Sequence, residues 1–139
     1  MRKILALVIF ALLLSGCNQA LTITEVKMDK VSRNLEETIE EFANENGNYL
    51  ISNGKEQYVF LNRKNIIEGE DKDVLSDFKT EVKEHTLYVS FEEEATADYE
   101  NQDLTDQLLY KVKGGKDDYD TIDLISNGES THFDQSISN

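Results

Sequence analysis

The sequence of 139 residues contains no proline, no tryptophan and a single cysteine, Cys17. Without proline, its turns have to be built from Gly, Asn, Asp and Ser. One cysteine excludes an internal disulfide, because a disulfide needs two thiols. Basic residues are also scarce, with 14 Lys and Arg against 28 Asp and Glu. This balance argues against nucleic acid as a partner, since phosphate binding requires clustered basic side chains.

Motifs that carry catalysis are equally scarce. The chain has no G-x-S-x-G element for a serine hydrolase and no glycine-rich loop for nucleotide phosphates. Its two histidines, His85 and His132, are far apart and lack the spacing of zinc ligands. We therefore expect no cofactor and no enzymatic activity. A carboxylate pair acting on a sugar stays open as an alternative, because acids are abundant.

Long apolar runs are absent except at the start of the chain. Arg2 and Lys3 precede an uncharged stretch at residues 4–14, which is followed by small residues. This order is typical of an export signal. Eleven helical residues span roughly 16 Å, well short of a hydrocarbon core of about 30 Å, so the segment predicts a signal peptide rather than a membrane span.

The end of this segment, Leu14-Ser15-Gly16-Cys17, resembles the lipobox of bacterial lipoproteins. The resemblance covers residues 1–17 only. It implies a thioether between the Cys17 sulfur and diacylglycerol, cleavage after Gly16, and a location on the extracytoplasmic face of the cell membrane. Two palmitate-type chains carry roughly 30 methylenes at about 0.8 kcal/mol each, which makes such an anchor effectively permanent. The type of envelope stays open.

Cleavage would leave 123 residues with a formal charge of −16, from 12 basic and 28 acidic side chains. We expect a short stem at residues 17–27, formed as a strand or a tether, and one domain at residues 28–139. No free thiol would remain in this mature chain. Its acidity favours a cationic partner, although charge also serves simply to keep an exported domain soluble.

Hydrophobic periodicity predicts an α+β fold, in which an N-terminal amphipathic helix packs on an antiparallel sheet of hairpin-connected strands. The helix is expected at residues 29–45, with Gly47 as its C-terminal cap. Its apolar face carries Val31, Leu35, Ile39 and Phe42. Period-two patterns predict strands at residues 48–52, 57–62, 77–83, 86–91, 108–112, 119–126 and 130–133. Acidic loops are expected at residues 66–74 and 92–103, with a frayed C-terminus. A β-sandwich carrying the helix as an appendage is the alternative.

Two sets of acids and two tyrosines are the candidate binding residues. The first set consists of Asp117, Asp118, Asp120 and Asp123, and the second of Glu92, Glu93 and Glu94. Calcium prefers several carboxylate oxygens, which the first set could supply. However, this set lacks the glycine of a calcium loop, and a strand at residues 119–126 would place its aspartates on different faces. Tyrosine is common at recognition surfaces, which makes Tyr88 and Tyr99 candidates for contact with a partner.

Three functions are compatible with these patterns. The first is a non-enzymatic binding or interaction module of the cell envelope, with a protein or peptide partner that presents a basic surface. The second is an acidic binder of cations or cationic peptides with a protective or immunity-like role, which requires the two acidic segments to converge. The third is a small carboxylate-based envelope enzyme. A short echo, Leu50 to Gly54 and Leu124 to Gly128, indicates repeated turn chemistry rather than duplication.

Overall fold

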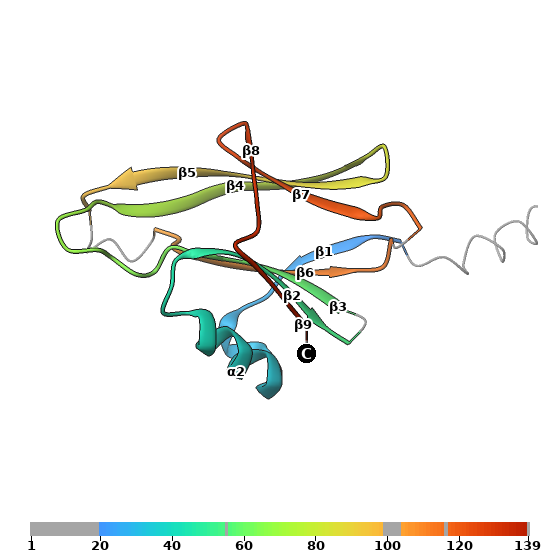
Figure 1. Cartoon of the computed structure of the whole chain (residues 1–139), viewed down its shortest axis with the longest axis horizontal. Helices are drawn as coiled ribbons and strands as arrows, with labels where there is room; N and C mark the ends of the chain where they lie inside the picture. Colours follow the sequence, from blue (N-terminus) through green and yellow to red (C-terminus); the bar gives the residue numbers. More distant parts are fainter. Residues whose placement is uncertain (1–19, 55, 99–103, 116, 139) are drawn as a thin grey trace, which may run out of the picture.

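Two β-sheets lie face to face in the computed structural model, which describes residues 20–54, 56–98, 104–115 and 117–138. A single α-helix covers the outer face of the larger sheet (Figure 1). The large sheet has the order β1 (Thr22–Glu25), β6 (Gln107–Lys113), β3 (Glu56–Asn62), β2 (Gly47–Asn53) and β9 (Gln135–Ser138). The small sheet has the order β4 (Lys72–Lys83), β5 (Thr86–Thr96), β7 (Thr121–Ser126) and β8 (Glu129–Thr131).

Helix and sheets together confirm the mixture of α and β structure, but the prediction of one antiparallel sheet is wrong. Strands β2 and β9 pair in parallel, and so do β5 and β7. Both parallel pairs arise because the chain changes sheets. It leaves β5 for β6 in the large sheet and returns to β7, and later it passes from β8 to β9. The architecture is therefore the two-sheet sandwich considered as the alternative, with the helix as a third layer.

The helix is shorter than predicted. A 3₁₀ turn, η1 (Met28–Lys30), precedes α2 (Arg33–Phe42), and the Ser32 hydroxyl accepts a hydrogen bond from the Leu35 amide at 3.4 Å. This N-cap satisfies one of the free amides at the helix start. Gly47 is not the C-terminal cap, because the helix has already ended and Gly47 begins β2. The predicted apolar face is confirmed, with Leu35 and Ile39 fully buried.

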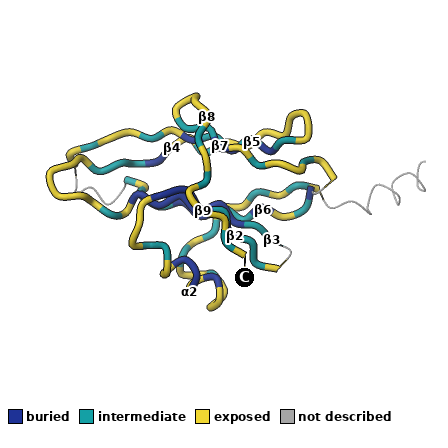
Figure 2. The backbone as a smooth tube through the Cα atoms, in the orientation of Figure 1, coloured by how far each residue is buried: buried dark blue, intermediate teal, exposed yellow. Residues whose placement is uncertain are grey.

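Burial on both faces of the large sheet explains the three layers. Along β3, Tyr58 and Phe60 pack toward the helix, whereas Val59 and Leu61 pack toward the small sheet. Each fully buried side chain of this size contributes about 1.5–3 kcal/mol. Figure 2 shows this buried centre between exposed outer strands. The continuous apolar run of β3 thus reflects a strand that is covered on both faces.

Several segments expected to be irregular are strands. Strand β4 begins at Lys72, inside the predicted loop at residues 66–74, and β5 continues to Thr96, inside the predicted loop at residues 92–103. These two strands pair with each other along their whole length except at one bulge, so the acids alternate between faces. The predicted stem contributes β1, and the predicted frayed end contributes β9.

The two Asn-Gly elements form turns, but with different register. In the β7–β8 hairpin, Asn127 and Gly128 are the two turn residues, both with positive φ. In the β2–β3 hairpin, Asn53 is still paired, and the turn begins at Gly54. The echo is thus a repeat of turn chemistry at shifted positions.

Candidate binding site between the sheets

On one side of the sandwich, the gap between the two sheets is covered over only part of its length. Residues 132–134 cross from β8 in the small sheet to β9 in the large sheet (Figure 1). The crossing is fixed to β2 by hydrogen bonds at Asn48: its amide donates to the Asp134 carboxylate at 2.7 Å, and its carbonyl accepts from the Asp134 amide at 2.7 Å. The Asn48 side chain also donates to the His132 carbonyl. On this half, the two sheets are firmly joined.

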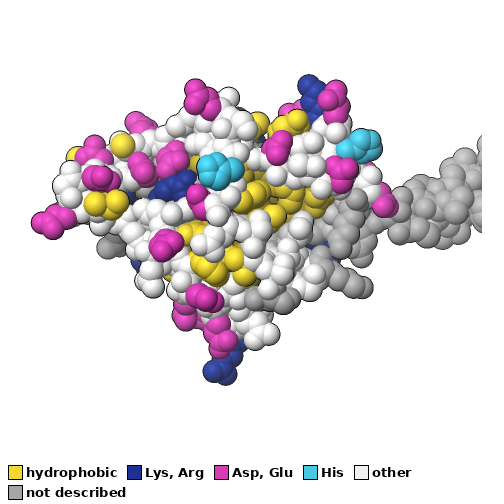
Figure 3. Space-filling model, viewed as in Figure 1, with side chains coloured by type: hydrophobic (Ala, Val, Ile, Leu, Met, Phe, Trp, Pro, Cys, Tyr) yellow, Lys and Arg dark blue, Asp and Glu magenta, His cyan; other side chains and the backbone are white. Residues whose placement is uncertain are grey.

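Beside the crossing, the two sheets leave an open cleft. Strand β8 pairs only with residues 124–126 of β7, and β9 pairs only with residues 49–52 of β2. The cleft has a volume of about 350 Å³. The residues that line it are Leu50, Ser52, Gly54, Gln57, Tyr119, Asp120 and Ile122. In the space-filling view, hydrophobic side chains reach the surface in the hollow between the sheets beside the crossing (Figure 3).

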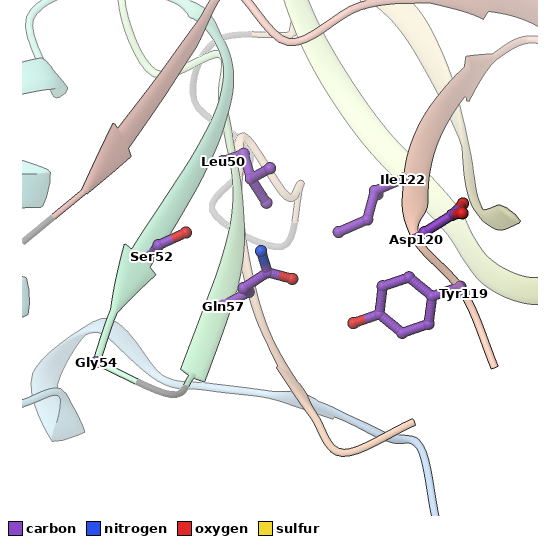
Figure 4. A pocket seen from close by; sticks show the side chains of 7 residues that line it. All are labelled: Leu50, Ser52, Gly54, Gln57, Tyr119, Asp120 and Ile122. Atoms are coloured by element: carbon purple, nitrogen blue, oxygen red, sulfur yellow. The ribbon is translucent and has the colours of Figure 1, made fainter. Parts of the chain in front are cut away.

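The cleft combines an apolar floor with a polar rim. Leu50 of β2 and Ile122 of β7 point toward each other across the gap, and both pack against the inter-sheet core (Figure 4). The Tyr119 hydroxyl, the Gln57 amide and the Ser52 hydroxyl lie around them. Burial raises the pKa of Tyr119, so its hydroxyl stays a neutral hydrogen-bond donor and acceptor. Such a lining suits an apolar group flanked by hydrogen-bonding atoms.

The four predicted aspartates do not form one site. Asp120 borders the cleft, but its carboxylate is turned away from the gap (Figure 4) and accepts a hydrogen bond from the Thr121 hydroxyl at 3.1 Å. Asp123 lies beside Tyr88 on the outer face of the small sheet. Asp117 and Asp118 are exposed in the turn before β7. Across the part of the chain that the structure describes, no group of three acids or histidines is placed to hold a metal ion.

The three consecutive glutamates are also divided. Glu93 faces inward and forms an ion pair with Arg63, at the end of β3, so it holds the two sheets together. Glu92 and Glu94 alternate with it and point to the outer face. Glu93 thus has a structural ion pair, and Glu92 and Glu94 are exposed.

Tyr88 lies on the outer face of the small sheet, as its alternation with Leu87 and Val89 predicted. It lines a shallow hollow of about 600 Å³ together with Lys79, Lys83 and Ile125. Lysine and glutamate side chains alternate with each other along this wall, so the hollow has no single charge. Tyr99 and Cys17 lie outside the described residues.

Both histidines lie at exposed positions. His85 is a turn residue between β4 and β5, and His132 lies 3.7 Å from the Asp134 carboxylate at the crossing. Within the described ranges, no helix has the length and apolar composition required to cross a membrane.

Sequence reasoning missed the residues that form the floor of the cleft. Leu50 and Ile122 read as ordinary core positions of two strands, and Gln57 as a strand end. Tyr119 was visible only as one of six tyrosines. The signal that unites them is tertiary, because their strands belong to different sheets.

Comparison with known protein families, with characterised proteins and with solved structures found no match for this chain.

Proposed function

We propose that this protein is a lipid-anchored binding module on the extracytoplasmic face of the cell membrane, which holds part of a partner molecule in the cleft between its sheets without catalysis. The observation that carries the proposal is the cleft itself. Apolar core side chains, Leu50 and Ile122, are accessible there, and neutral polar groups surround them. Exposed apolar surface with a polar rim is typical of an interaction site.

The lipobox supports the anchor, and the position of β1 limits its reach. Thr22 is paired with Lys113 at the start of the large sheet, five residues after Cys17. Five extended residues span about 17 Å at most. Leu21 also packs on Gly115, where an added Cβ would meet Leu21 at 2.7 Å. The end of the sandwich that carries β1 would therefore stand close to the membrane.

The cation-binder alternative requires the two acidic segments to converge, and the described acids of the two segments lie apart. Asp120 directly precedes β7, where its amide donates to the His85 carbonyl, whereas Glu92 lies at the other end of the small sheet beside Asn127. Roughly seven strand residues, or about 23 Å, separate the two acids. This spacing favours the binding module over a site formed jointly by both acidic segments.

Site-specific photo-crosslinking tests the proposal in the native envelope. A benzophenone amino acid at Asp120 places the reactive group beside the cleft without filling it, and the same amino acid at Glu37, on the exposed side of α2, serves as the matched control. We expect an adduct of defined mass from position 120 and none from position 37. Equal adduct patterns from both positions, or no adduct at position 120, would contradict the proposal.

A further inference from the structure

We infer that the cleft accepts an extended peptide segment, which adds as a strand to the free edge of β7 and places one apolar side chain between Leu50 and Ile122, with basic side chains on either side. This inference rests on the proposed function and names the chemical class of the partner. Addition of a strand to an exposed sheet edge is a general mode of peptide recognition.

The free edge is the first half of β7. Strand β8 ends at Thr131, which pairs with Leu124, and the chain then turns away toward the large sheet. Residues 121–123 therefore have β5 on one side and no paired strand on the other within the described chain. Ser126 and Leu124 direct their backbone groups to Glu129 and Thr131 of β8, whereas the Asn127 amide bonds toward β5 at the Phe91 carbonyl. Because successive residues present their backbone groups to opposite sides, Ile122 presents its amide and carbonyl to the open edge.

The position of the cleft defines the side chain that it takes. A strand continuing the line of β8 would place one residue opposite Ile122, with its side chain directed inward, as Ile122 is. That residue would enter the gap toward Leu50 and the hydroxyls of Ser52 and Tyr119 (Figure 4). The cleft of about 350 Å³ corresponds to about twelve water volumes, which is ample for an aliphatic side chain.

Charge defines the flanking residues. The neighbours of the inward residue would lie opposite Thr121 and Asp123, whose side chains point to the outer face. Asp120, Asp117 and Asp118 lie exposed before the edge, and the whole chain has a formal charge of −14. A lysine or arginine opposite Asp123 would form a cross-strand pair, whereas an acid would be repelled. The partner segment is therefore basic–apolar–basic.

A labelled peptide, Lys-Thr-Lys-Leu-Lys-Thr-Lys, tests this pattern against the lipidated full chain in nanodiscs of phosphatidylcholine, with empty nanodiscs as the blank. We expect saturable binding by fluorescence anisotropy. Replacing the leucine by serine, or the lysines by glutamate, should weaken binding at least tenfold. Methylating the backbone amide of the leucine should weaken it about tenfold, since this amide would bond to the Ile122 carbonyl at the edge of β7.

Two protein variants locate the site. Ser52→Trp fills the cleft and should abolish binding, while Asp123→Asn should weaken it about two- to fivefold at low salt. A melting curve checks that each variant is folded; if Ser52→Trp is not, the peptide series on the unaltered protein decides. Binding that is indifferent to backbone methylation, or to the exchange of lysine for glutamate, would overturn the inference. An adduct from position 120 without binding of the peptide would reject this ligand class and leave the binding module standing.

Discussion

The ion pair between Arg63 and Glu93 joins the two sheets at the end opposite the proposed peptide edge. Arg63 is only 8% exposed, and the Glu93 side chain is 21% exposed. Besides Glu93, the guanidinium donates to the Gly47 carbonyl at 3.0 Å and to the Asn48 side-chain oxygen at 2.7 Å. Asn48 in turn bonds to the crossing at residues 132–134. One side chain thus satisfies acceptors from both sheets.

Substitution Arg63→Met should lower the free energy of unfolding by about 3–5 kcal/mol. Methionine keeps the volume of the aliphatic part of the arginine side chain, but it leaves the Glu93 carboxylate and the buried acceptors without a donor. An unpaired buried charge costs about 3–5 kcal/mol. Glu93→Gln removes only the charge and should cost about 1–3 kcal/mol. The double variant Arg63→Met/Glu93→Met removes both charges, so its cost should be smaller than the sum of the single costs by about 1–3 kcal/mol.

Urea unfolding followed by far-ultraviolet circular dichroism measures these differences, because the chain has no tryptophan to report. Arg33→Met is the matched control, since Arg33 pairs with Glu37 on the exposed helix surface and should change stability by less than about 1 kcal/mol. An Arg63→Met variant as stable as the Arg33→Met control would refute the reasoning, and so would strictly additive costs in the double variant.

Three further predictions concern a turn, a buried phenol and the anchor. Glu84 and His85 both have positive φ in the β4–β5 turn, so Glu84→Asn with His85→Gly should raise the melting midpoint by a few degrees in a thermal scan, and an unchanged or lower midpoint would contradict this. Burial and a hydrogen bond to Glu56 raise the pKa of Tyr58 to about 12. The contribution of the neutral phenol to the free energy of unfolding is therefore complete below pH 10, its ordinary pKa, and about 3 kcal/mol of it is lost as the pH rises toward 12. Urea titrations at several pH values should show a smaller alkaline loss of stability in Tyr58→Phe, and an equal loss in both proteins would contradict this. Cys17→Ser should abolish incorporation of labelled palmitate and release the protein from membranes, whereas retained label would disprove the lipobox assignment.

The elements that were predictable from the sequence depend on neighbours in the chain. Leu35 and Ile39 are four residues apart and define the buried helix face without reference to any other element. Asn127 and Gly128 form a tight turn because both tolerate positive φ. In each case the physical cause lies within one turn of helix or one hairpin.

The elements that were not predictable depend on distant partners. Parallel pairing of β5 with β7 joins strands separated by a visit to the other sheet, and local pattern carries no trace of it. The same holds for the cleft, where Leu50 and Ile122 meet from strands far apart in the chain. Glu93 lies between two identical residues in the sequence, and only its register opposite Leu75 shows that its side chain faces inward.

The opposite edge of the small sheet, strand β4, is protected against pairing with other strands, whereas the first half of β7 is not. Strand β4 has a bulge between Ser76 and Lys79, alternating charges at its exposed end, and a hydrogen bond from Leu75 to the Thr105 carbonyl. Bulges, charges and covering segments are the usual devices that prevent unwanted strand pairing. At β7 the chain could have extended β8 by three residues, yet it crosses to the other sheet at His132 and leaves an apolar cleft beside unpaired backbone. An open edge beside an apolar cleft, in a sheet whose opposite edge is protected, supports the proposal that a strand from another molecule pairs there.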